Sequence, residues 1–535
     1  MMKSIKTILG RELPDYIDGY GEVKPFQGAF SDGGIKTRKA VKLTSVTPYD
    51  RKVLANLEQV YDKLNMKDGM TISFHHHLRN GDHVLNMVVE GLAKRGIKDL
   101  TIAASSIFPV HAPLVEHMKS GVVTGIVANY MSGPVPEAIS RGELKKPAIM
   151  QTHGGRPRAI ESGDLHIDVA FIAAPTADTY GNINGVYGKS ACGTLGYAIS
   201  DAEYADKTIA ITDNLVPYPA CPIEISQVFV DYVVQVESIG DPKGIVSGTT
   251  KITKDPVALI IAKMAAEVIK ASGLVENGMS FQTGAGGTSL AVAAGLKDIM
   301  KREGVVGSFA AGGITGYLVE MLEEGLFKTL FDVQCFDFKA IESYRNNARH
   351  QFMSASMYGN PHTKGAVVNN LDIMILGATE IDTEFNVNVT TSSNGVIMGG
   401  SGGHSDTAAG SKLAIVVTNL MKARLPMIKD KVTTITTPGE NIDVVVTERG
   451  IAVNPRRMDL IEKLSRTNLP LVTIGELKTM AEKITGVPKA VRNSEKIVAV
   501  VEYRDGSVID VVRGSRDTSS AMRSSCQTRA LILDA

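Results

Sequence analysis

The chain has 535 residues, more than one hydrophobic core usually organises, so two domains of roughly 200 to 250 residues are expected. The 57 basic side chains (Lys and Arg) balance 57 acidic ones, which excludes a long-range field attracting nucleic acid or an anionic membrane. The four cysteines show no C-x-x-C spacing, which argues against a zinc site or a disulfide framework and indicates a reducing compartment, the cytoplasm.

Residues 1–45 are predicted to be an N-terminal extension. The first residues, MMKSIKTILGRELPDYI, begin with a basic stretch, but their apolar run is too short for a signal peptide. The most apolar later run, residues 257–269, is interrupted by Lys263 and Glu267. That run therefore predicts a packed helix, and no membrane span is expected.

The first cluster of candidate site residues is His75-His76-His77, with Arg79 close behind it. In a strand only His75 and His77 would share a face, and no carboxylate lies at the expected helical spacing. Strand-end histidines that are partly solvated or bind an anion are therefore favoured over a metal site. Further on, His153-Gly-Gly-Arg156-Pro-Arg158 places two guanidiniums beside a glycine turn, which suits a carboxylate or phosphate; exposed arginines of a solvated loop are the alternative.

Several motifs recur after about 204 residues, which indicates an internal duplication. Asp168, before a β-branched run, returns as Asp372, and Asp178 with Asn182-Ile-Asn184 returns as Asp382 with Asn386-Val-Asn388. In each copy, β-branched runs alternate with helical patterns, which is typical of parallel strands covered by helices. The sequence therefore predicts two related α/β domains with mostly parallel sheets, at residues 46–245 and 256–513.

Two local structures are predicted in the second copy. Asp255 and Pro256 form a cap and a first-turn proline, and Gly273 follows the last apolar turn, so a helix is expected over 256–272. Near the end, residues 498–502 and 508–512 flank Arg504-Asp505-Gly506, which is a hairpin signal. The tail, residues 514–535, is polar and unpatterned and receives no structural prediction.

A glycine loop, Thr283-Gly284-Ala-Gly286-Gly287, separates a short apolar run from a helical pattern. Glycines let the backbone approach a ligand, and the start of a helix presents free N–H groups, so the loop predicts a site for an anion or a developing oxyanion. It lacks the third glycine of G-x-G-x-x-G and the lysine of a P-loop. A helix start that simply needs a tight turn would look the same.

A second glycine loop, Gly400-Ser401-Gly402-Gly403, lies in the stretch Gly399-Gly-Ser-Gly-Gly-His-Ser-Asp406, which contains G-x-S-x-G with His404 and Asp406 close by. A serine hydrolase is one hypothesis, but a His three residues from the Ser is not easily oriented by an Asp two residues further. A plain connecting turn is another alternative. The number of glycines favours a loop whose backbone packs against a ligand.

A larger set of motifs carries a family resemblance that extends over about residues 11–512. The motifs are Gly69-Met-Thr-Ile-Ser-Phe-His-His76, His111-Ala-Pro-Leu-Val-Glu-His117, His153-Gly-Gly-Arg156, Ile167-Asp-Val-Ala-Phe171, Ser280-Phe-Gln-Thr-Gly284, Ile381-Asp-Thr-Glu-Phe-Asn-Val-Asn388, Ser401-Gly-Gly-His404 and Tyr503-Arg-Asp-Gly-Ser-Val-Ile-Asp510. With these motifs the chain resembles the alpha subunits of bacterial citrate lyase, which are citrate CoA-transferases. That family resembles the wider CoA-transferases, which consist of two related α/β domains.

The resemblance implies an acyl transfer in which citrate replaces acetate on an acetyl thioester. The implied carrier is CoA or the CoA-like prosthetic group of an acyl carrier protein, and no metal is implied in this subunit. Implied partners are citrate, acetyl-ACP, a citryl-lyase beta subunit and an acyl carrier gamma subunit, in a homo-oligomer within a larger complex. No nucleic acid or membrane partner is expected.

The resemblance also suggests roles for the motifs. Catalytic N–H donors would come from Gly284, Gly286, Gly287, Gly402 and Gly403. Citrate would be bound by His75, His76, Arg79, Arg156 and His404. The thioester carrier would contact Thr283, Gly284, Gly400, Ser401 and Gly402.

The sequence departs from the family pattern of many CoA-transferases, which use a glutamate nucleophile in Gly-Ile-His-Ser-Glu-Met. The nearest counterpart here is Gly313-Ile-Thr-Gly-Tyr317, and Glu320 lies three residues further, where a structural role is favoured. Direct transfer through an acetyl-citryl anhydride is therefore expected. A covalent-glutamate CoA-transferase, an acyl-CoA hydrolase, a citramalate CoA-transferase and a non-enzymatic scaffold are the alternatives.

Overall fold

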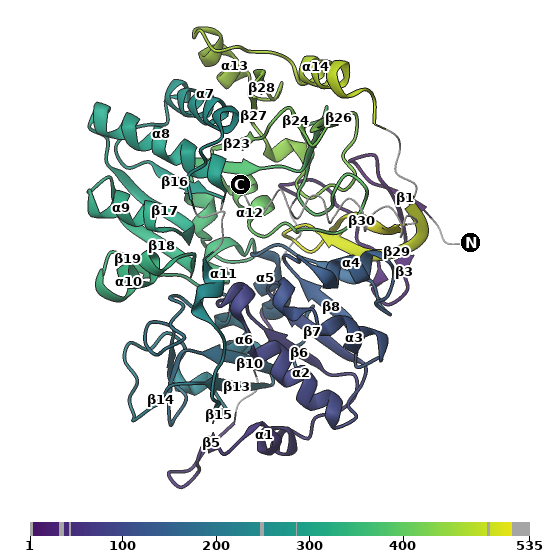
Figure 1. Cartoon of the computed structure of the whole chain (residues 1–535), viewed down its shortest axis with the longest axis vertical. Coiled ribbons are helices and arrows are strands. Elements are labelled where there is room, and N and C mark those ends of the chain that lie inside the picture. Colours follow the sequence, from purple (N-terminus) through teal and green to yellow (C-terminus); the bar gives the residue numbers. More distant parts are fainter. Residues whose placement is uncertain are drawn as a thin grey trace.

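The computed structural model describes residues 4–31, 37–41, 44–246, 251–284, 286–488 and 493–515. These residues form two α/β units, purple to blue and teal to green in Figure 1. The apolar runs β10 (Val169–Ala174) and β23 (Leu413–Val417) are buried along their whole length. Strands of this kind belong in the middle of parallel sheets that are covered on both faces.

The first sheet is parallel except for the strand pair at one edge, β29 with β30. Its order is β30 (Val508–Ser515), β29 (Asn493–Glu502), β9 (Ala148–Met150), β8 (Val123–Ala128), β7 (Leu100–Ala104), β6 (Thr71–Phe74), β10, β13 (Lys207–Thr212), β15 (Tyr232–Gln235) and β5 (Val53–Leu54). Its helices are α1 (Leu57–Leu64), α2 (Val84–Lys94), α3 (Leu114–Lys119), α4 (Pro134–Ser140), α5 (Gly155–Ser162) and α6 (Ile199–Tyr204).

The second sheet is parallel except for β27 with β28. Its order is β19 (His350–Phe352), β18 (Phe327–Cys335), β17 (Gly307–Ile314), β16 (Ser280–Thr283), β20 (Ile373–Gly377), β23, β27 (Val444–Thr447) and β28 (Gly450–Val453). Its helices are α7 (Pro256–Ser272), α8 (Gly287–Glu303), α9 (Gly316–Glu323), α10 (Phe338–Asn346), α11 (Ala355–Gly359), α12 (His404–Gly410), α13 (Met458–Ser465) and α14 (Ile474–Thr485).

The predicted duplication is confirmed by the sheets. The order β8-β7-β6-β10-β13-β15 in the first unit is repeated as β18-β17-β16-β20-β23-β27 in the second. Matching hydrogen bonds accompany it: Asp168 accepts from the Thr71 N–H at 2.7 Å, and Asp372 accepts from the Ser280 N–H at 2.7 Å. The predicted fold class, two related α/β units with mostly parallel sheets, is therefore confirmed.

Helix α7 has the predicted bounds. The Asp255 side chain accepts from the Val257 N–H, Pro256 occupies the first turn, and Gly273 ends the helix with φ +80°. These are the preferred residues for a helix start and a left-handed helix end. The predicted boundary between the two copies includes residues 247–250, which lie outside the described residues.

The C-terminal hairpin, β29 with β30, is the largest departure from the expected arrangement. The sequence pattern predicts that residues up to 513 belong to the second domain. In the structure β29 instead pairs in parallel with β9 and extends the first sheet. Figure 1 shows the yellow hairpin beside α4 of the first unit. The chain therefore returns to its first unit after completing the second. The tail beyond Ser515 lies outside the described residues.

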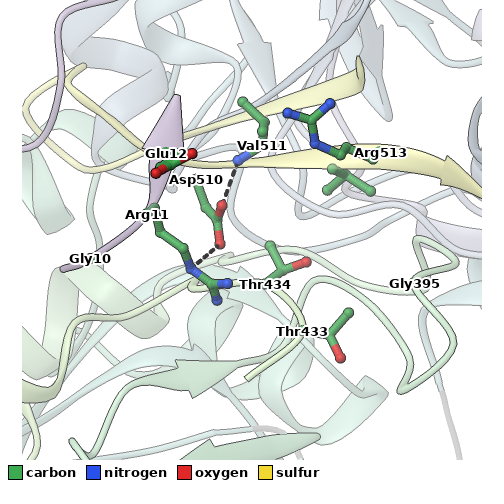
Figure 2. A pocket seen from close by; sticks show the side chains of 10 residues that line it. Gly10, Arg11, Glu12, Gly395, Thr433, Thr434, Asp510, Val511 and Arg513 are labelled. Carbon is green, nitrogen blue, oxygen red and sulfur yellow. Dashed lines mark hydrogen bonds and ion pairs between the residues drawn. The ribbon is translucent and has the colours of Figure 1, made fainter. Parts of the chain in front are cut away.

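The N-terminal extension contacts the rest of the protein where the C-terminal hairpin meets the second unit. A pocket of about 290 Å³ lies there, lined in part by Arg11, Thr434 and Asp510 (Figure 2). The Arg11 guanidinium lies 3.1 Å from Asp510 and donates to the Val432 carbonyl at 2.7 Å. These contacts connect the extension both to the hairpin, through Asp510, and to the second unit, through Val432.

Among the described helices, none is both long and apolar enough to cross a lipid bilayer.

Candidate functional site

Strands β6 and β16 hold equivalent central places in their sheets, and a candidate motif follows each of them. β6 lies between β7 and β10, and β16 lies between β17 and β20, so the order of connection reverses at both strands. Ligands of open α/β sheets bind beyond the carboxyl ends of strands at such points. The duplication thus places the His75 to Arg79 segment and the first glycine loop at corresponding positions. Ala285 of that loop lies outside the described residues.

A pocket of about 230 Å³ opens at the start of α8, and we call it the α8 pocket. Its lining comprises Gly284, Gly286, Gly287, Thr288, Ser289, Gly377, Ala378, Val417, Thr418, Asn419, Lys422 and Met427. The first N–H groups of α8, the positive end of its dipole and the exposed Lys422 ammonium all favour an anionic group there. Thr283 is buried, and its hydroxyl donates to the Gly284 carbonyl at 3.3 Å.

The second glycine loop, residues 400–403, belongs to the second unit but bonds to the first. The Gly402 N–H donates to the Asn129 carbonyl at 3.1 Å, and the His153 N–H donates to the Gly402 carbonyl at 2.8 Å. Gly402 has φ +50°, and a Cβ added to Gly403 would collide with the Tyr358 hydroxyl. Glycine is therefore required at both positions, by backbone conformation at one and by packing at the other.

The polar residues of this second loop do not form a Ser-His-Asp relay. Ser401 contacts a neighbouring serine hydroxyl at 3.1 Å. The His404 Nε2–H donates to the Gly377 carbonyl at 2.9 Å, and its Nδ1 pairs with the Thr437 hydroxyl at 2.8 Å. Asp406 bonds to the first unit instead of to His404. The geometry therefore favours a ligand-facing backbone over a hydrolase nucleophile.

Both ring nitrogens of His404 bond to protein atoms, so neither is free to bind citrate. Burial lowers the pKa of His404 to about 4, so the ring is neutral near pH 7. A neutral ring with both nitrogens bonded supplies neither a charge nor a hydrogen bond to a substrate. The structure thus places this predicted substrate residue in a supporting position.

The two glycine loops are neighbours. Gly377 lines the α8 pocket and accepts the bond from His404, the residue that follows Gly403. Gln282, in β16, donates to the Tyr358 hydroxyl at 2.8 Å, and the same hydroxyl packs against Gly403. The α8 pocket and the second loop therefore belong to one region of the second unit.

A group of rings and one guanidinium lies where the two units meet, and we call it the interdomain ring cluster. Its members are His76, Arg79, Phe108, His153, Tyr197 and Phe336. The Tyr197 ring centroid is 4.6 Å from the centroids of both His76 and His153, and Gln334 of the second unit donates to the His76 carbonyl at 2.9 Å. The predicted site residues do not include Phe108, Tyr197 or Phe336, because dispersed aromatic residues give no spacing signal.

Arg79 is the cation of the interdomain ring cluster. Its guanidinium carbon lies 5.5 Å from the Phe108 centroid and 4.8 Å from the Phe336 centroid, one ring from each unit. Its φ of +51° is uncommon for a residue with a side chain. Burial lowers the pKa of Arg79, and in the described part of the chain its guanidinium has no hydrogen bond or ion pair. A half-buried, unpaired guanidinium is suited to an anionic ligand.

A buried pair supports the Arg79 turn. Asp82 accepts from His111 Nε2–H at 3.1 Å and from the Leu85 N–H at 3.1 Å, the latter at the start of α2. His111 Nδ1 accepts from the Phe108 N–H at 3.1 Å, which leaves the ring proton on Nε2. The Asp82–His111 pair thus holds the turn that carries Arg79. Through His111 it also holds the backbone of Phe108, whose ring lies against the Arg79 guanidinium.

Arg156, the other arginine expected at citrate, is already occupied. It is 1% exposed, and its guanidinium donates to both carboxylate oxygens of Asp201, at 2.6 and 2.8 Å, and to the Ala103 carbonyl at 3.0 Å. This bidentate pair lies inside the first unit. Arg156 is therefore a structural residue in this fold, whereas Arg79 is accessible to a ligand.

His75 and His76 take different places. His75 Nε2 accepts from the Ala173 N–H at 3.0 Å, and its Nδ1 contacts His77, so its ring lies inside the first unit. His76 belongs to the interdomain ring cluster and contacts the Ser105 hydroxyl at 2.5 Å. Burial lowers the pKa of both, that of His75 to about 4, so neither ring supplies positive charge near pH 7.

Glu320 lies outside this region. It is on α9, its side chain is 45% exposed, and it forms an ion pair with Lys339 at 3.2 Å. A nucleophilic carboxylate has to face the reacting thioester, and Glu320 faces solvent. The position therefore agrees with the structural role that is favoured for Glu320.

Asp406 joins three separate parts of the chain. It accepts from the Thr152 hydroxyl at 2.9 Å and the Gly154 N–H at 2.8 Å, and it lies 3.6 Å from Arg504 of the C-terminal hairpin. The duplication contains a signal for this role, because α12 corresponds to α6, in which Asp201 binds a buried arginine. In the sequence, Asp406 is recognisable only as a candidate member of a triad.

Asp406 is expected to make folding less favourable as the pH rises. Burial raises the pKa of Asp406 from 3.8 to about 6, although Arg504 opposes the shift. The folded state therefore binds this proton more tightly, and the resulting stability is present below about pH 4 and is lost as the pH rises through about 6. The shift corresponds to about 3 kcal/mol of unfolding free energy.

Urea unfolding of the native protein and Asp406→Asn at pH 4 and pH 7.5 measures this effect. From pH 4 to pH 7.5, the free energy of unfolding of the native protein should fall by about 3 kcal/mol relative to that of the variant. A difference between the two proteins that stays the same at both pH values would contradict the assigned shift.

Comparison with known proteins extends this description. Residues 50–515 match the family described as citrate lyase, alpha subunit (CitF). The chain is 52% identical over 473 residues to the citrate lyase alpha chain of Haemophilus influenzae, covering 88% of this chain and 95% of that one. It is 49% identical to a solved alpha subunit of citrate lyase from Streptococcus mutans, in complex with citrate, with a TM-score of 0.92 over 96% of this chain and 100% of that one.

More distant structures share the fold. A malonate decarboxylase alpha subunit from Acinetobacter baumannii is 16% identical, with a TM-score of 0.60 over 82% of this chain and 93% of that one. A 4-hydroxybutyrate CoA-transferase from Porphyromonas gingivalis is 17% identical, with a TM-score of 0.51 over 81% of this chain and 96% of that one. The two-unit architecture is thus that of CoA-transferase-like proteins.

Proposed function

Because the chain belongs to the citrate lyase alpha subunit family, we propose that it is a citrate CoA-transferase acting on the acetyl thioester of an acyl carrier protein or of CoA. A citrate carboxylate oxygen attacks the acetyl carbon and the thiolate leaves, which gives an acetyl-citryl anhydride. The thiolate then attacks the citryl carbon and acetate leaves, which gives the citryl thioester. Both steps pass through tetrahedral oxyanions.

Arg79 binds the citrate carboxylates. Its guanidinium is held between Phe108 and Phe336 and carries the unpaired positive charge of the interdomain ring cluster. His76 contributes a neutral hydrogen-bonding ring beside it. The rings of Phe108 and Phe336 would exclude water from the bound acid and so protect an anhydride from hydrolysis.

The α8 pocket receives the phosphate and pantetheine parts of the thioester carrier, and the second glycine loop receives the oxyanion. Gly284, Gly286 and Gly287 line the pocket at the start of α8, with Lys422 as a cation. In the described part of the chain the Gly403 N–H donates to no protein acceptor, so it is available to an oxyanion. Gly400, Ser401 and Gly402 shape this loop.

One observation carries the proposal: the pocket for an anionic carrier, the second glycine loop and Arg79 are joined by direct contacts. Gly377, in the lining of the pocket, accepts a hydrogen bond from His404, the residue that follows the second loop. The His153 N–H connects that loop to the interdomain ring cluster. Direct transfer is favoured over a covalent glutamate because Glu320 is exposed and paired with Lys339.

The function is tested by supplying acetyl-CoA with citrate, with citramalate or with neither acid, and identifying the acyl-CoA formed. Citryl-CoA and acetate are expected with citrate. Formation of the citramalyl product alone would assign the other acid. Loss of the thioester without any acid would indicate a hydrolase, a glutamate trapped by hydroxylamine would indicate a covalent mechanism, and absence of any turnover would support a scaffold.

The α8 pocket gives a second expected result. Lys422→Glu should raise the KM for acetyl-CoA by about tenfold, the loss of one charge-assisted contact, and leave the KM for citrate unchanged. Steady-state kinetics with each substrate varied in turn measures both values. Lys364→Glu makes the same charge change at an exposed lysine outside the pocket lining and should leave both KM values unchanged. Equal effects of the two variants would argue against the pocket as the carrier site.

The family also suggests the setting. We propose that the protein acts in the cytoplasm, as a homo-oligomer within a citrate lyase complex. There it would receive acetyl-ACP from an acyl carrier gamma subunit and pass citryl-ACP to a citryl-lyase beta subunit. No metal is assigned to this subunit.

A further inference from the structure

The backbone around His153 is held from both units, and the proposed reaction assigns no role to its ring. Thr152 and Gly154, on either side, both donate to Asp406, while the His153 N–H donates to the Gly402 carbonyl. A Cβ at Gly402 would lie 3.3 Å from His153 Nε2, so the ring lies against the second glycine loop. These contacts leave the ring little freedom to move.

One ring nitrogen of His153 supports a role in ligand binding. His153 Nδ1 is buried, and it has no hydrogen-bond partner among the described residues. The ring packs against Tyr197 at 4.6 Å and His76 at 5.9 Å, between centroids, so it borders the proposed citrate site. Leaving a buried polar atom unpaired is unfavourable, and a substrate group that hydrogen-bonds to it removes this penalty.

The protonation state of the His153 ring indicates which substrate group it can bind. Burial and the nearby Arg156 lower the pKa of His153 to about 3, so at pH 7 the ring is neutral, with one donor and one acceptor. Arg79 already supplies charge for the carboxylates. Among the groups of citrate, the hydroxyl is the one that both donates and accepts without carrying charge.

We propose that His153 is a specificity residue that hydrogen-bonds the hydroxyl of the acid substrate through Nδ1, so that the site selects hydroxy acids. This inference rests on the proposed function. Citrate and citramalate both carry the hydroxyl, whereas propane-1,2,3-tricarboxylate keeps three carboxylates and lacks it. A site that hydrogen-bonds a hydroxyl discriminates strongly against the analogue without it.

The test compares citrate with propane-1,2,3-tricarboxylate in the native protein, His153→Phe and His153→Asn. The native protein should prefer citrate in kcat/KM by about 100-fold or more. His153→Phe should lose about 100-fold on citrate and change little on the tricarboxylate, so the preference disappears. His153→Asn places an amide near the position of Nδ1 and should recover part of the preference. Thermal unfolding of each variant checks that it is folded.

The inference would be overturned by an equal loss on both acids in His153→Phe, or by an unchanged preference for citrate in that variant. Calorimetric binding of the two acids to the same three proteins gives a readout that does not need turnover. If the native protein forms no citryl thioester, the proposed function fails. The loss of binding preference in His153→Phe would still support recognition of the hydroxyl, and equal binding of both acids by the native protein would contradict it.

Discussion

Arg79→Gln is expected to lower kcat/KM for citrate by about 100- to 1000-fold, because two charge-assisted hydrogen bonds to a carboxylate contribute roughly 3 to 4 kcal/mol together. Glutamine keeps a polar side chain but loses the charge and the planar fork of donors. The KM for acetyl-CoA should remain within about twofold, because the proposed carrier site is the α8 pocket. Steady-state kinetics with each substrate varied separately gives the two values.

The Arg79→Lys variant separates charge from shape. Lysine restores the positive charge, but its ammonium cannot fill the space between Phe108 and Phe336 or bind a carboxylate with two parallel bonds. Its kcat/KM for citrate should lie between those of the native protein and Arg79→Gln. If Arg79→Gln used citrate as well as the native protein does, citrate would have to bind elsewhere.

Gly403→Ala is expected to reduce kcat by about 100- to 1000-fold, the usual effect of losing one oxyanion donor. An added Cβ would collide with the Tyr358 hydroxyl, so either that side chain or the loop must move. Movement of the loop shifts the Gly403 N–H from the position proposed for the oxyanion. Single-turnover measurements of thioester exchange report the chemical step directly.

The double variant Gly403→Ala, Tyr358→Phe provides the matched control. Without the hydroxyl, the nearest Tyr358 atoms would lie 3.1 and 3.2 Å from the new Cβ, a tight contact that a small shift relieves. The double variant should therefore recover at least about tenfold in kcat over Gly403→Ala alone. Tyr358→Phe alone, which loses only the Gln282 bond, should retain most of the activity. Normal exchange by Gly403→Ala would remove this loop from the catalytic proposal.

Local and repeated features of the fold could be predicted from the sequence. Helix α7 is specified by Asp255, Pro256 and Gly273, which act within a few residues of the helix ends. The duplication was visible in the sequence because residues such as Asp168 and Asp372 recur about 204 positions apart. In the structure these two residues make the same hydrogen bond in each copy. The position of the C-terminal hairpin could not be read in this way, because the pairing of β29 with β9 joins strands that are far apart in the chain.

The site could be predicted only in part, for a similar reason. The glycine loops and Arg79 were found because their residue types have a direct chemical meaning. Whether an arginine is free depends on its partner, and Arg156 is occupied by Asp201, 45 residues further along the chain. Spacing within a motif carries no information on such a pairing.

The return of the C-terminal hairpin to the first sheet affects the order of folding during synthesis. While a ribosome is still making the second unit, the first has emerged but lacks β29, so the β9 edge has open N–H and C=O groups. Arg504, which lies beside Asp406, also arrives only with these last residues. The junction that adjoins the interdomain ring cluster is therefore complete only when nearly the whole chain has been translated, and incomplete chains lack it.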